Sequence, residues 1–182
     1  MLQLVEGRPY EEGNRLEKEI RVYDYLDKLG LKYERVDHEP LMTMEACEEV
    51  DKIVNASICK NLLLRNSQKT MFYMLMMPGN KKFKTKELSS QLGIARLSFA
   101  EPEYMEQYLN ITPGSLSVMG LMNDEECKVR LLIDEDLLKS KYIGVHPCIN
   151  TSTLRIETAD LIRIYLPAVK HDYTPVKLFG LD

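Results

Sequence analysis

The sequence predicts a single-domain α+β protein whose sheet is mixed or largely antiparallel. The chain has 182 residues, which suits one domain and allows a sizeable hydrophobic core. Its middle contains two apolar runs separated by a short polar segment, which is typical of a β-hairpin. Helical and strand patterns follow one another without the regular alternation that a doubly wound fold requires.

The N-terminal part begins with residues 1–13, which we expect to form a loose extension. A helix is predicted from Asn14, because apolar residues recur at helical spacing and Gly30 stands where a C-terminal cap belongs. These apolar residues are Leu16, Ile20, Tyr23 and Leu26. Residues 31–36 have the pattern of a strand, and the sequence His38-Glu39-Pro40 ends it.

The middle of the chain continues with a short helix, which Thr43 is expected to cap and which runs to about Val50. The two strands of the predicted hairpin are residues 58–65 and 70–77, joined by a polar turn at residues 66–69.

Two further helices are predicted after the hairpin. Thr85 is expected to cap one that stops at Gly93, and Pro102 fits the first turn of another that ends at Leu109. Residues 129–134 have the pattern of a strand.

The last predicted helix is capped by Thr158 and stopped by Pro167. We assign residues 14–170 to one domain and residues 171–182 to a C-terminal tail.

Composition narrows the class of protein. The hydrophobic fraction of 45% and the charged fraction of 29% are typical of a folded globular chain. The longest apolar run, residues 71–77, falls far short of the ~20 residues of a membrane helix, and the N-terminus lacks the pattern of a secretory signal. We therefore expect a soluble, cytoplasmic protein with no membrane partner.

Charge and metal-binding residue types exclude further classes. The formal net charge of −4 argues against broad, sequence-independent binding of nucleic acids, DNA included, although it leaves room for a local basic patch. The four cysteines form no C-x-x-C pair and the chain has three histidines, so we expect no metal centre. The nucleophile elbow, the P-loop and the dinucleotide-binding glycine motif are absent.

Lys60 and Asn61 are the first candidate site residues, because they interrupt an otherwise apolar strand, residues 58–64. A buried ammonium group is costly unless it reaches solvent or an anion. Lys60 is therefore either an outward-pointing lysine on an edge strand or a lysine on a cleft wall that faces a phosphate or carboxylate.

Two glycine-containing segments form a second group of candidates, residues 113–115 and 120–124. Glycines there allow backbone N–H groups to approach a substrate carbonyl, as an oxyanion site requires. The same residues are also compatible with an ordinary turn and hairpin.

His146 lies before Pro147, which holds its backbone extended and so fixes the direction of its ring. The sequence leaves open whether it is a hydrogen-bonding group in a pocket, a general base or a packed surface residue. Cys148 follows closely, but no feature that would lower the pKa of its thiol is apparent, so a cysteine nucleophile is disfavoured.

A basic run with one aromatic residue, residues 81–86, precedes Arg96. Such runs are usually solvated surface, but this one is also a candidate contact for an RNA backbone. Its candidate RNA-binding residues are Lys81, Lys82 and Lys84.

Taken together, these segments resemble the YbaK/prolyl-tRNA-synthetase-associated domain family, and among its members the free-standing prolyl-tRNA deacylases. The similarity runs from about Tyr23 to Tyr165, and its fragments occur in the expected order. They are Lys28-Leu29-Gly30-Leu31, His38-Glu39-Pro40, Cys59-Lys60-Asn61-Leu62-Leu63-Leu64, Leu92-Gly93, Arg96-Leu97-Ser98-Phe99-Ala100, Pro113-Gly114-Ser115, Gly120-Leu121-Met122-Asn123-Asp124 and His146-Pro147-Cys148-Ile149-Asn150-Thr151. The sequence departs from the family pattern at Leu63, where phenylalanine is more usual, and at Cys148, where leucine is commoner.

The resemblance implies a compact domain around a curved mixed sheet, no metal and no organic cofactor. It also implies hydrolysis of the ester that joins a mischarged amino acid, often alanine, to the 3′ end of proline tRNA. Lys60, Asn61 and His146 match its catalytic residues. Its substrate-binding loops correspond to Gly114, Ser115, Gly120, Asn123, Asp124 and Asn150.

Three other functions remain open at this point. The chain is alternatively a deacylase of Cys-tRNA(Pro), a non-catalytic module that binds tRNA or prolyl-tRNA synthetase, or a ligand-sensing protein that kept the fold and lost the activity. Intact Lys60, Asn61 and His146 argue against the last.

Overall fold

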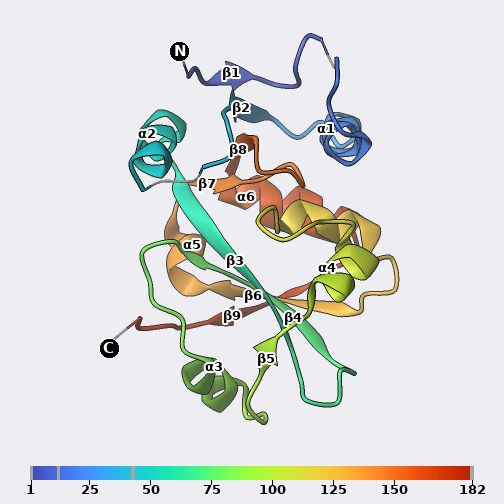
Figure 1. The fold of residues 1–182 in the computed structure, drawn as a ribbon, viewed down its shortest axis with the longest axis vertical. Helices are drawn as coiled ribbons and strands as arrows, with labels where there is room; N and C mark the ends of the chain where they lie inside the picture. The colour runs from blue at the N-terminus through green and yellow to red at the C-terminus, as the bar shows by residue number, and fades with distance from the viewer. Residues whose placement is uncertain (1, 12, 42–43, 181–182) are drawn as a thin grey trace.

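A curved nine-stranded sheet forms the centre of the computed structural model, which describes residues 2–11, 13–41 and 44–180. The strand order is β1-β2-β8-β7-β3-β4-β6-β9, and β5 pairs with β3 beside this path (Figure 1). Five of the eight pairings within the described residues are antiparallel, and β3–β7, β4–β6 and β6–β9 are parallel. The α+β expectation of a mixed, largely antiparallel sheet is confirmed. The strands are β1 (Val5–Glu6), β2 (Tyr33–Asp37), β3 (Ser57–Arg65), β4 (Phe72–Pro78), β5 (Ser98–Phe99), β6 (Val129–Asp134), β7 (Tyr142–Val145), β8 (Ser152–Glu157) and β9 (Tyr173–Val176).

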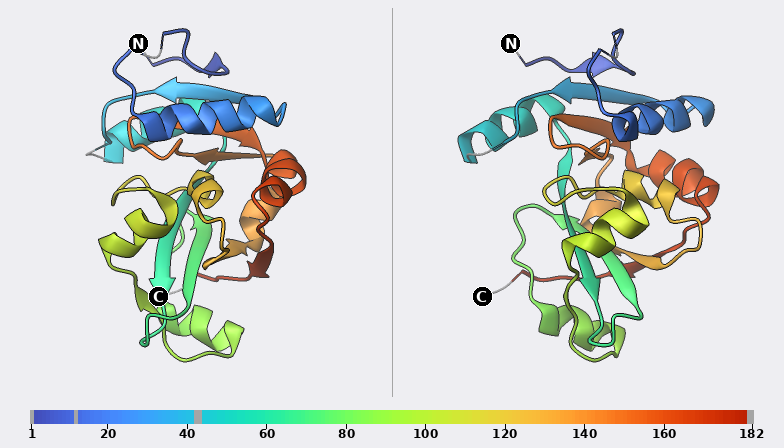
Figure 2. Two further views of the ribbon diagram at one scale, coloured as in Figure 1. Left: turned by 90° about the vertical axis from the view of Figure 1, so that its right-hand side faces the viewer. Right: turned by 45° about the vertical axis from the view of Figure 1, so that its right-hand side comes forward.

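Helices flank both halves of the sheet. α1 and α2 lie with β1, β2 and β8 at one end of the molecule, whereas α3 and β5 lie at the other (Figures 1 and 2). The helices are α1 (Glu17–Lys28), α2 (Met44–Val54), α3 (Thr85–Leu92), α4 (Pro102–Leu109), the 3₁₀ helix η1 (Val118–Asn123), α5 (Glu135–Lys139), α6 (Thr158–Asp160), the π-helical segment η2 (Leu161–Tyr165) and α7 (Leu166–Ala168). Among the described residues, no helix combines the length and the apolarity that crossing a membrane would require.

The core explains why β4 is apolar along its whole length. Met74 and Met76 point into the larger cluster, which α1, η1 and β8 complete, whereas Leu75 and Met77 point into a second cluster under α3. Successive side chains of a strand face opposite sides of a sheet, so a strand covered on both faces is apolar at every position. A third, smaller cluster joins Val36 of β2 to α2.

The central strand β3 is paired unevenly. β4 pairs with it from Cys59 to Arg65 on one edge. On the other edge β7 pairs with Ser57 and Ile58, and β5 pairs with Leu64 and Arg65. The edge of β3 between these two partners therefore stays open in the middle of the sheet.

Most predicted elements are present with shifted ends. The hairpin strands and the strand at residues 129–134 are confirmed, as are the left-handed cap at Gly93, with φ +67°, and Pro102 in the first turn of α4. Thr85 is the first residue of α3 and not its cap, so that expectation is wrong. The first helix begins three residues after Asn14 and the second continues past Val50. The expected cap Thr43 lies outside the described residues.

Two expected helix signals are wrong at the end of the chain. Thr158 is the first residue of α6 rather than its side-chain cap, and its hydroxyl is buried without a partner within the described residues. Pro167 does not stop the helix, which continues to Ala168. The preceding turn is π-helical, with the N–H of Leu166 bonded to the carbonyl of Leu161, and this wider spacing accommodates a residue that has no N–H of its own.

The two chain ends are joined to the sheet more closely than expected. Val5 and Glu6 pair with β2, and Arg35 donates to the carbonyl of Gly7 at 2.7 Å, so this part of residues 1–13 is not a loose extension. In the expected C-terminal tail, β9 pairs with β6, and Val176 is buried. Both segments become strands by pairing with a strand that is distant in the sequence. Neither has a local pattern strong enough to predict a strand.

Candidate functional site

A cavity of about 840 Å³ opens at the unpaired edge of β3, and we call it the β3-edge cavity. Its walls come from β3, the turn after β4, α2, β7, β8 and two loops around residues 114 and 146–150. The residues lining it are Leu41, Cys47, Val50, Asp51, Ala56, Ser57, Ile58, Cys59, Lys60, Asn61, Pro78, Gly79, Asn80, Gly114, Gly144, Val145, His146, Asn150 and Thr153. Five of the residues singled out from the sequence thus meet here, from segments that are far apart in the chain.

Lys60 lies on the wall of this cavity. Its ammonium nitrogen Nζ donates a hydrogen bond to the carbonyl oxygen of Lys81 at 2.5 Å. An outward-pointing, solvated lysine does not fit, because Lys60 is half-buried and its ammonium is bonded to a backbone carbonyl of the protein. An ammonium has three donors, so two remain for a ligand in the cavity.

The side-chain oxygen of Asn61 is a hydrogen-bond acceptor that has no donor among the described residues. Its amide Nδ2 donates to the carbonyl of Leu116 at 3.0 Å, which fixes the orientation of the amide, since the reversed amide would bring two oxygens together. The other atom, Oδ1, is buried and has no hydrogen-bond partner among the described residues. Buried polar atoms are nearly always hydrogen-bonded, so a bound ligand or an ordered water that donates to Oδ1 is expected here.

His146 offers a neutral ring nitrogen to the cavity. Its Nδ1 lies 2.8 Å from the carbonyl oxygen of Ser152, so the proton is on Nδ1 and Nε2 is the acceptor. Burial lowers the pKa of His146, the bond to Ser152 opposes this, and the neighbouring His38, with ring centroids 6.4 Å apart, lowers it further. The imidazole is thus uncharged at neutral pH and able to accept a proton or a hydrogen bond.

The loops that carry Gly114 and Asn150 meet at the cavity. Gly114 has φ +89°, a conformation that favours glycine, and a Cβ there would lie 3.9 Å from Nδ2 of Asn150. The N–H of Gly114 makes no hydrogen bond within the described part of the chain, whereas that of Ser115 is bonded to the carbonyl of Thr112 at 3.2 Å. Gly114 therefore provides a backbone donor that has no partner among the described residues.

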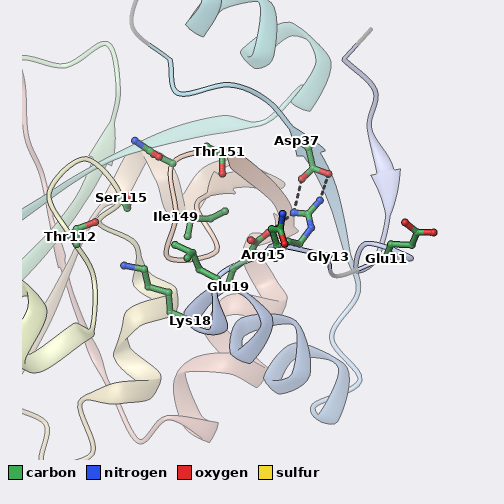
Figure 3. Close-up of a pocket in the computed structure, with 13 residues that line it drawn as sticks. Glu11, Gly13, Arg15, Lys18, Glu19, Asp37, Thr112, Ser115, Ile149 and Thr151 are labelled. Carbon is green, nitrogen blue, oxygen red and sulfur yellow. Dashed lines mark hydrogen bonds and ion pairs between the residues drawn. The ribbon is translucent and has the colours of Figure 1, made fainter.

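Ser115 instead lines a second cavity, of about 540 Å³, which it shares with Asn150 (Figure 3). The opposite wall is an ion-pair network in which Arg15 bonds both Glu19 and Asp37. Asn150 lines both cavities, whereas Ser115 lines only the second.

Three residues predicted to bind substrate have other contacts and do not line the β3-edge cavity. Gly120 is buried, its N–H is bonded to Ser117, and a Cβ would lie 2.6 Å from Ile111. Asn123 donates to the carbonyl of Leu109 at 2.8 Å. These contacts close the turn between α4 and η1.

Asp124 is likewise part of the framework. Its carboxylate accepts from the backbone N–H groups of Lys128 and Val129 at 2.9 and 2.8 Å and lies 3.0 Å from Nε2 of the buried His171. Both carboxylate oxygens are bonded within the protein and Asp124 is only 3% exposed, so it is not accessible to a substrate.

The three lysines of the basic run have different surroundings in the structure. The Lys81 ammonium bonds the carboxylates of Asp134 and Asp136 at 2.9 and 2.7 Å and the carbonyl of Leu178, so its charge is neutralised within the protein. Lys82 and Lys84 are exposed. Lys81 is therefore a structural residue, and the exposed pair keeps the candidate role in RNA binding.

The cysteines at this site are not activated for thiol chemistry. Burial raises the pKa of Cys59, which lines the cavity, and that of Cys148 to about 12, so neither is a thiolate at neutral pH. The described residues contain no group of three or more metal-binding side chains.

Sequence reasoning missed several lining residues, of which Asp51, Ser57, Asn80 and Thr153 are polar. Thr153 donates its hydroxyl to Nε2 of His38 at 2.8 Å, because Nδ1 of His38 donates to the carbonyl of Glu39. Thr153 lies on β8, a strand that the sequence pattern did not reveal, and His38 was noted only as part of a motif.

Known proteins are similar to this chain over most of its length. Residues 38–164 match the aminoacyl-tRNA editing domain. The chain is 34% identical over 140 residues to the prolyl-tRNA editing protein ProX of Acetoanaerobium sticklandii, a match that covers 76% of this chain and 85% of that protein. It is 27% identical over 165 residues to the prolyl-tRNA synthetase associated domain-containing protein 1 of Danio rerio, covering 90% and 86%.

Solved structures share the fold. One, described as a candidate trans-editing enzyme for prolyl tRNA synthetase, matches with a TM-score of 0.63 at 17% identity and covers 90% of this chain and 98% of its own. The hypothetical protein APE2540 matches with a TM-score of 0.65 at 15% identity, covering 87% and 98%. The family match and the ProX relative each span most of the sequence. The chain belongs to the aminoacyl-tRNA editing domain family.

Proposed function

We propose that this protein is a trans-editing deacylase that hydrolyses mischarged tRNA(Pro), with Ala-tRNA(Pro) as its main substrate. The family and the names of the relatives support the reaction class and the tRNA. The observation that carries the proposal is the convergence of Lys60, Asn61, Gly114, His146 and Asn150 on one cavity.

The chemistry needs no strong protein nucleophile, because an aminoacyl ester is already activated. Positioning the ester against water or the ribose 2′-hydroxyl, with a donor for the developing oxyanion, supplies most of the acceleration. The two free donors of Lys60 hold the phosphate or ribose of the terminal nucleotide. The N–H of Gly114 faces the ester carbonyl, and Nε2 of His146 accepts a hydrogen bond from the attacking hydroxyl or water.

Asn61 recognises the amino acid of the substrate. A substrate carries an α-ammonium group next to the ester, and that group supplies the donor that the buried Oδ1 lacks. Asn150 completes the wall between the two cavities. Alanine is chosen over proline sterically, because a rigid pocket rejects a bulkier side chain more easily than a smaller one. Cysteine is close to alanine in size, so Cys-tRNA(Pro) is the alternative substrate.

The partner is the 3′ end of mischarged tRNA(Pro), with prolyl-tRNA synthetase as a second candidate partner. The exposed Lys82 and Lys84 contact the RNA backbone, and the β3-edge cavity receives the terminal adenosine with its ester. The carbonyl of Lys81, to which Lys60 donates, lies directly before these exposed lysines in the chain.

The test is a comparison of esters on one tRNA. Purified protein is incubated with Ala-, Cys- and Pro-tRNA(Pro) and with Ala-tRNA(Ala), and single-turnover hydrolysis is followed. Ala-tRNA(Pro) should be hydrolysed at least tenfold faster than the others. Faster hydrolysis of the cysteinyl ester would make the alternative substrate the correct one. Tight tRNA binding without hydrolysis of any ester would instead identify a non-catalytic module.

A further inference from the structure

A third cavity, of about 720 Å³, lies between α3 and β5, and we call it the Phe99 cavity. It contains two aromatic rings, those of Phe83 and Phe99, and three cationic side chains, those of Lys84, Lys86 and Arg96. No carboxylate from the described residues lines it. This combination is unusual for a chain with a formal net charge of −4.

The aromatic pair is held in place with one ring uncovered. Phe99 pairs with Leu64 in the short strand β5, yet 60% of it is exposed. Phe83 packs against the cluster under α3, and the two ring centroids are 6.0 Å apart at an interplanar angle of 69°. A rigidly mounted, exposed phenylalanine offers a planar surface on which another planar group can stack.

The cations of this cavity are not neutralised as other basic groups of the protein are. Lys84, Lys86 and Arg96 are exposed, and their side chains make no ion pair or hydrogen bond with the rest of the described chain. Lys81 and Arg65, by contrast, bond to carboxylates. Three uncompensated cations around an aromatic ring match a phosphate-linked base, because the rings stack on the base and the cations attract the backbone.

The Phe99 cavity lies on the same face of β3 as Lys60, the lysine of the proposed site. Phe99 shares a face with its partner Leu64, and Leu64 shares a face with Lys60, four residues earlier. At about 3.3 Å per residue the two positions are roughly 13 Å apart along the strand. Stacked nucleotides rise about 3.4 Å each, so about four of them would span this separation.

We propose that the Phe99 cavity binds an unpaired base, with its phosphate, in the single-stranded 3′ end of the tRNA whose terminal ester lies at Lys60. This inference rests on the proposed function and adds a subsite to it. A single-stranded end suits the cavity better than a helical stem does, since a base inside a duplex has no free face to stack on Phe99.

The test measures binding of uncharged tRNA(Pro), intact or trimmed back to its last base pair, by fluorescence anisotropy. Phe99→Ala should weaken binding of the intact tRNA about tenfold, because stacking on an aromatic side chain is worth ~1–3 kcal/mol per base. It should leave the trimmed tRNA unaffected. Phe99→Tyr should stay within about twofold of the parent, since it keeps the ring. Phe179→Ala is the matched control, because Phe179 is 59% exposed and does not line the cavity.

Two further measurements locate the contact. A 2-aminopurine placed in turn at each unpaired position should change fluorescence on binding at one position, and Phe99→Ala should abolish that change. The double variant Lys84→Ala/Arg96→Ala should reduce the slope of log K against log salt by about 1 to 2, as expected when two phosphate contacts to a single strand are lost.

The outcomes separate this subsite from the proposed function. Binding of intact tRNA that depends on Phe99 supports the subsite even if no ester is hydrolysed, in which case the proposed function alone fails. Hydrolysis of Ala-tRNA(Pro) with unchanged affinity in Phe99→Ala would overturn the subsite alone. Equal weakening for intact and trimmed tRNA, failure of the parent to bind tRNA, or loss of binding only to prolyl-tRNA synthetase would each also overturn it.

Discussion

Replacing Lys60 by alanine should remove most of the catalytic activity and little of the stability. The ammonium group of Lys60 donates one hydrogen bond to the carbonyl of Lys81, and its two other N–H groups can bond the substrate. Hydrogen bonds to charged groups contribute about 1.5–3 kcal/mol each. Losing about 3 kcal/mol of transition-state stabilisation lowers kcat/KM on the order of a hundredfold.

The cost to folding should be small because the bond to Lys81 is a single hydrogen bond at a cavity wall. Its loss should reduce the free energy of unfolding by about 1 kcal/mol, measured by urea denaturation. Lys60→Met is a useful companion, since it keeps an unbranched apolar stem and removes the charge. It should be as inactive as Lys60→Ala. Lys60→Arg should recover activity only in part, because a planar fork does not occupy the place of a compact ammonium.

Single-turnover hydrolysis of Ala-tRNA(Pro) at saturating protein separates the chemical step from binding. Exchanging Lys82 and Lys84 together for alanine should weaken binding and flatten its salt dependence, while the rate at saturation stays close to the parent. Lys81 is left out of this control because it pairs with aspartates. Near-normal hydrolysis by a well-folded Lys60→Ala protein would refute the assignment of the site.

Three further predictions concern groups outside the reacting atoms. Cys59→Ala and Cys148→Ala, made separately, should keep the deacylation rate within about tenfold of the parent if the proteins fold, because burial raises both thiol pKa values to about 12. Complete loss of activity in a folded Cys148→Ala protein would instead support a thiol mechanism. Burial lowers the pKa of His171, but its bond to the Asp124 carboxylate outweighs this and raises the pKa above the ordinary value of 6.5. The stability that His171 contributes is therefore fully present below about pH 6.5 and is lost as pH rises through the folded pKa. The difference in unfolding free energy between the parent and His171→Asn should shrink from pH 6 to pH 9, and a difference that grows would contradict this. Lys81→Met should lower the unfolding free energy by about 3 kcal/mol, because Asp134, 1% exposed, loses its ion pair; a change below 0.5 kcal/mol would mean that the ion pair is unimportant.

The sequence pattern identified the strongly patterned elements and missed the short ones. β3, β4 and β6 are apolar along most of their length because helices or loops cover both faces, so their strands stood out. β7 and β8 have four and six residues. Their identity depends on partners distant in the chain, and short segments of that kind have no clear period.

Candidate residues fell into two groups that no local pattern distinguishes. Lys60, Gly114 and His146 line one cavity, whereas Gly120 and Asp124 support the packing of η1 and of the turn after it. A glycine or an aspartate in a loop has the same appearance in both settings, because the sequence shows the residue type and not the atoms that surround it.

By itself the sequence determined the fold class, the family resemblance and which polar residue types interrupt apolar segments, since these depend on local periodicity and on the order of motifs. Only the tertiary structure decided that Lys60 faces a cavity at a gap in the sheet, that Asn61 keeps an unsatisfied acceptor there, and that Lys81 is neutralised by aspartates. The gap exists because β7 and β5 pair with opposite ends of β3. The physical reason is that burial, charge pairing and hydrogen-bond satisfaction are set by residues far apart in the chain, which sheet pairing alone brings together.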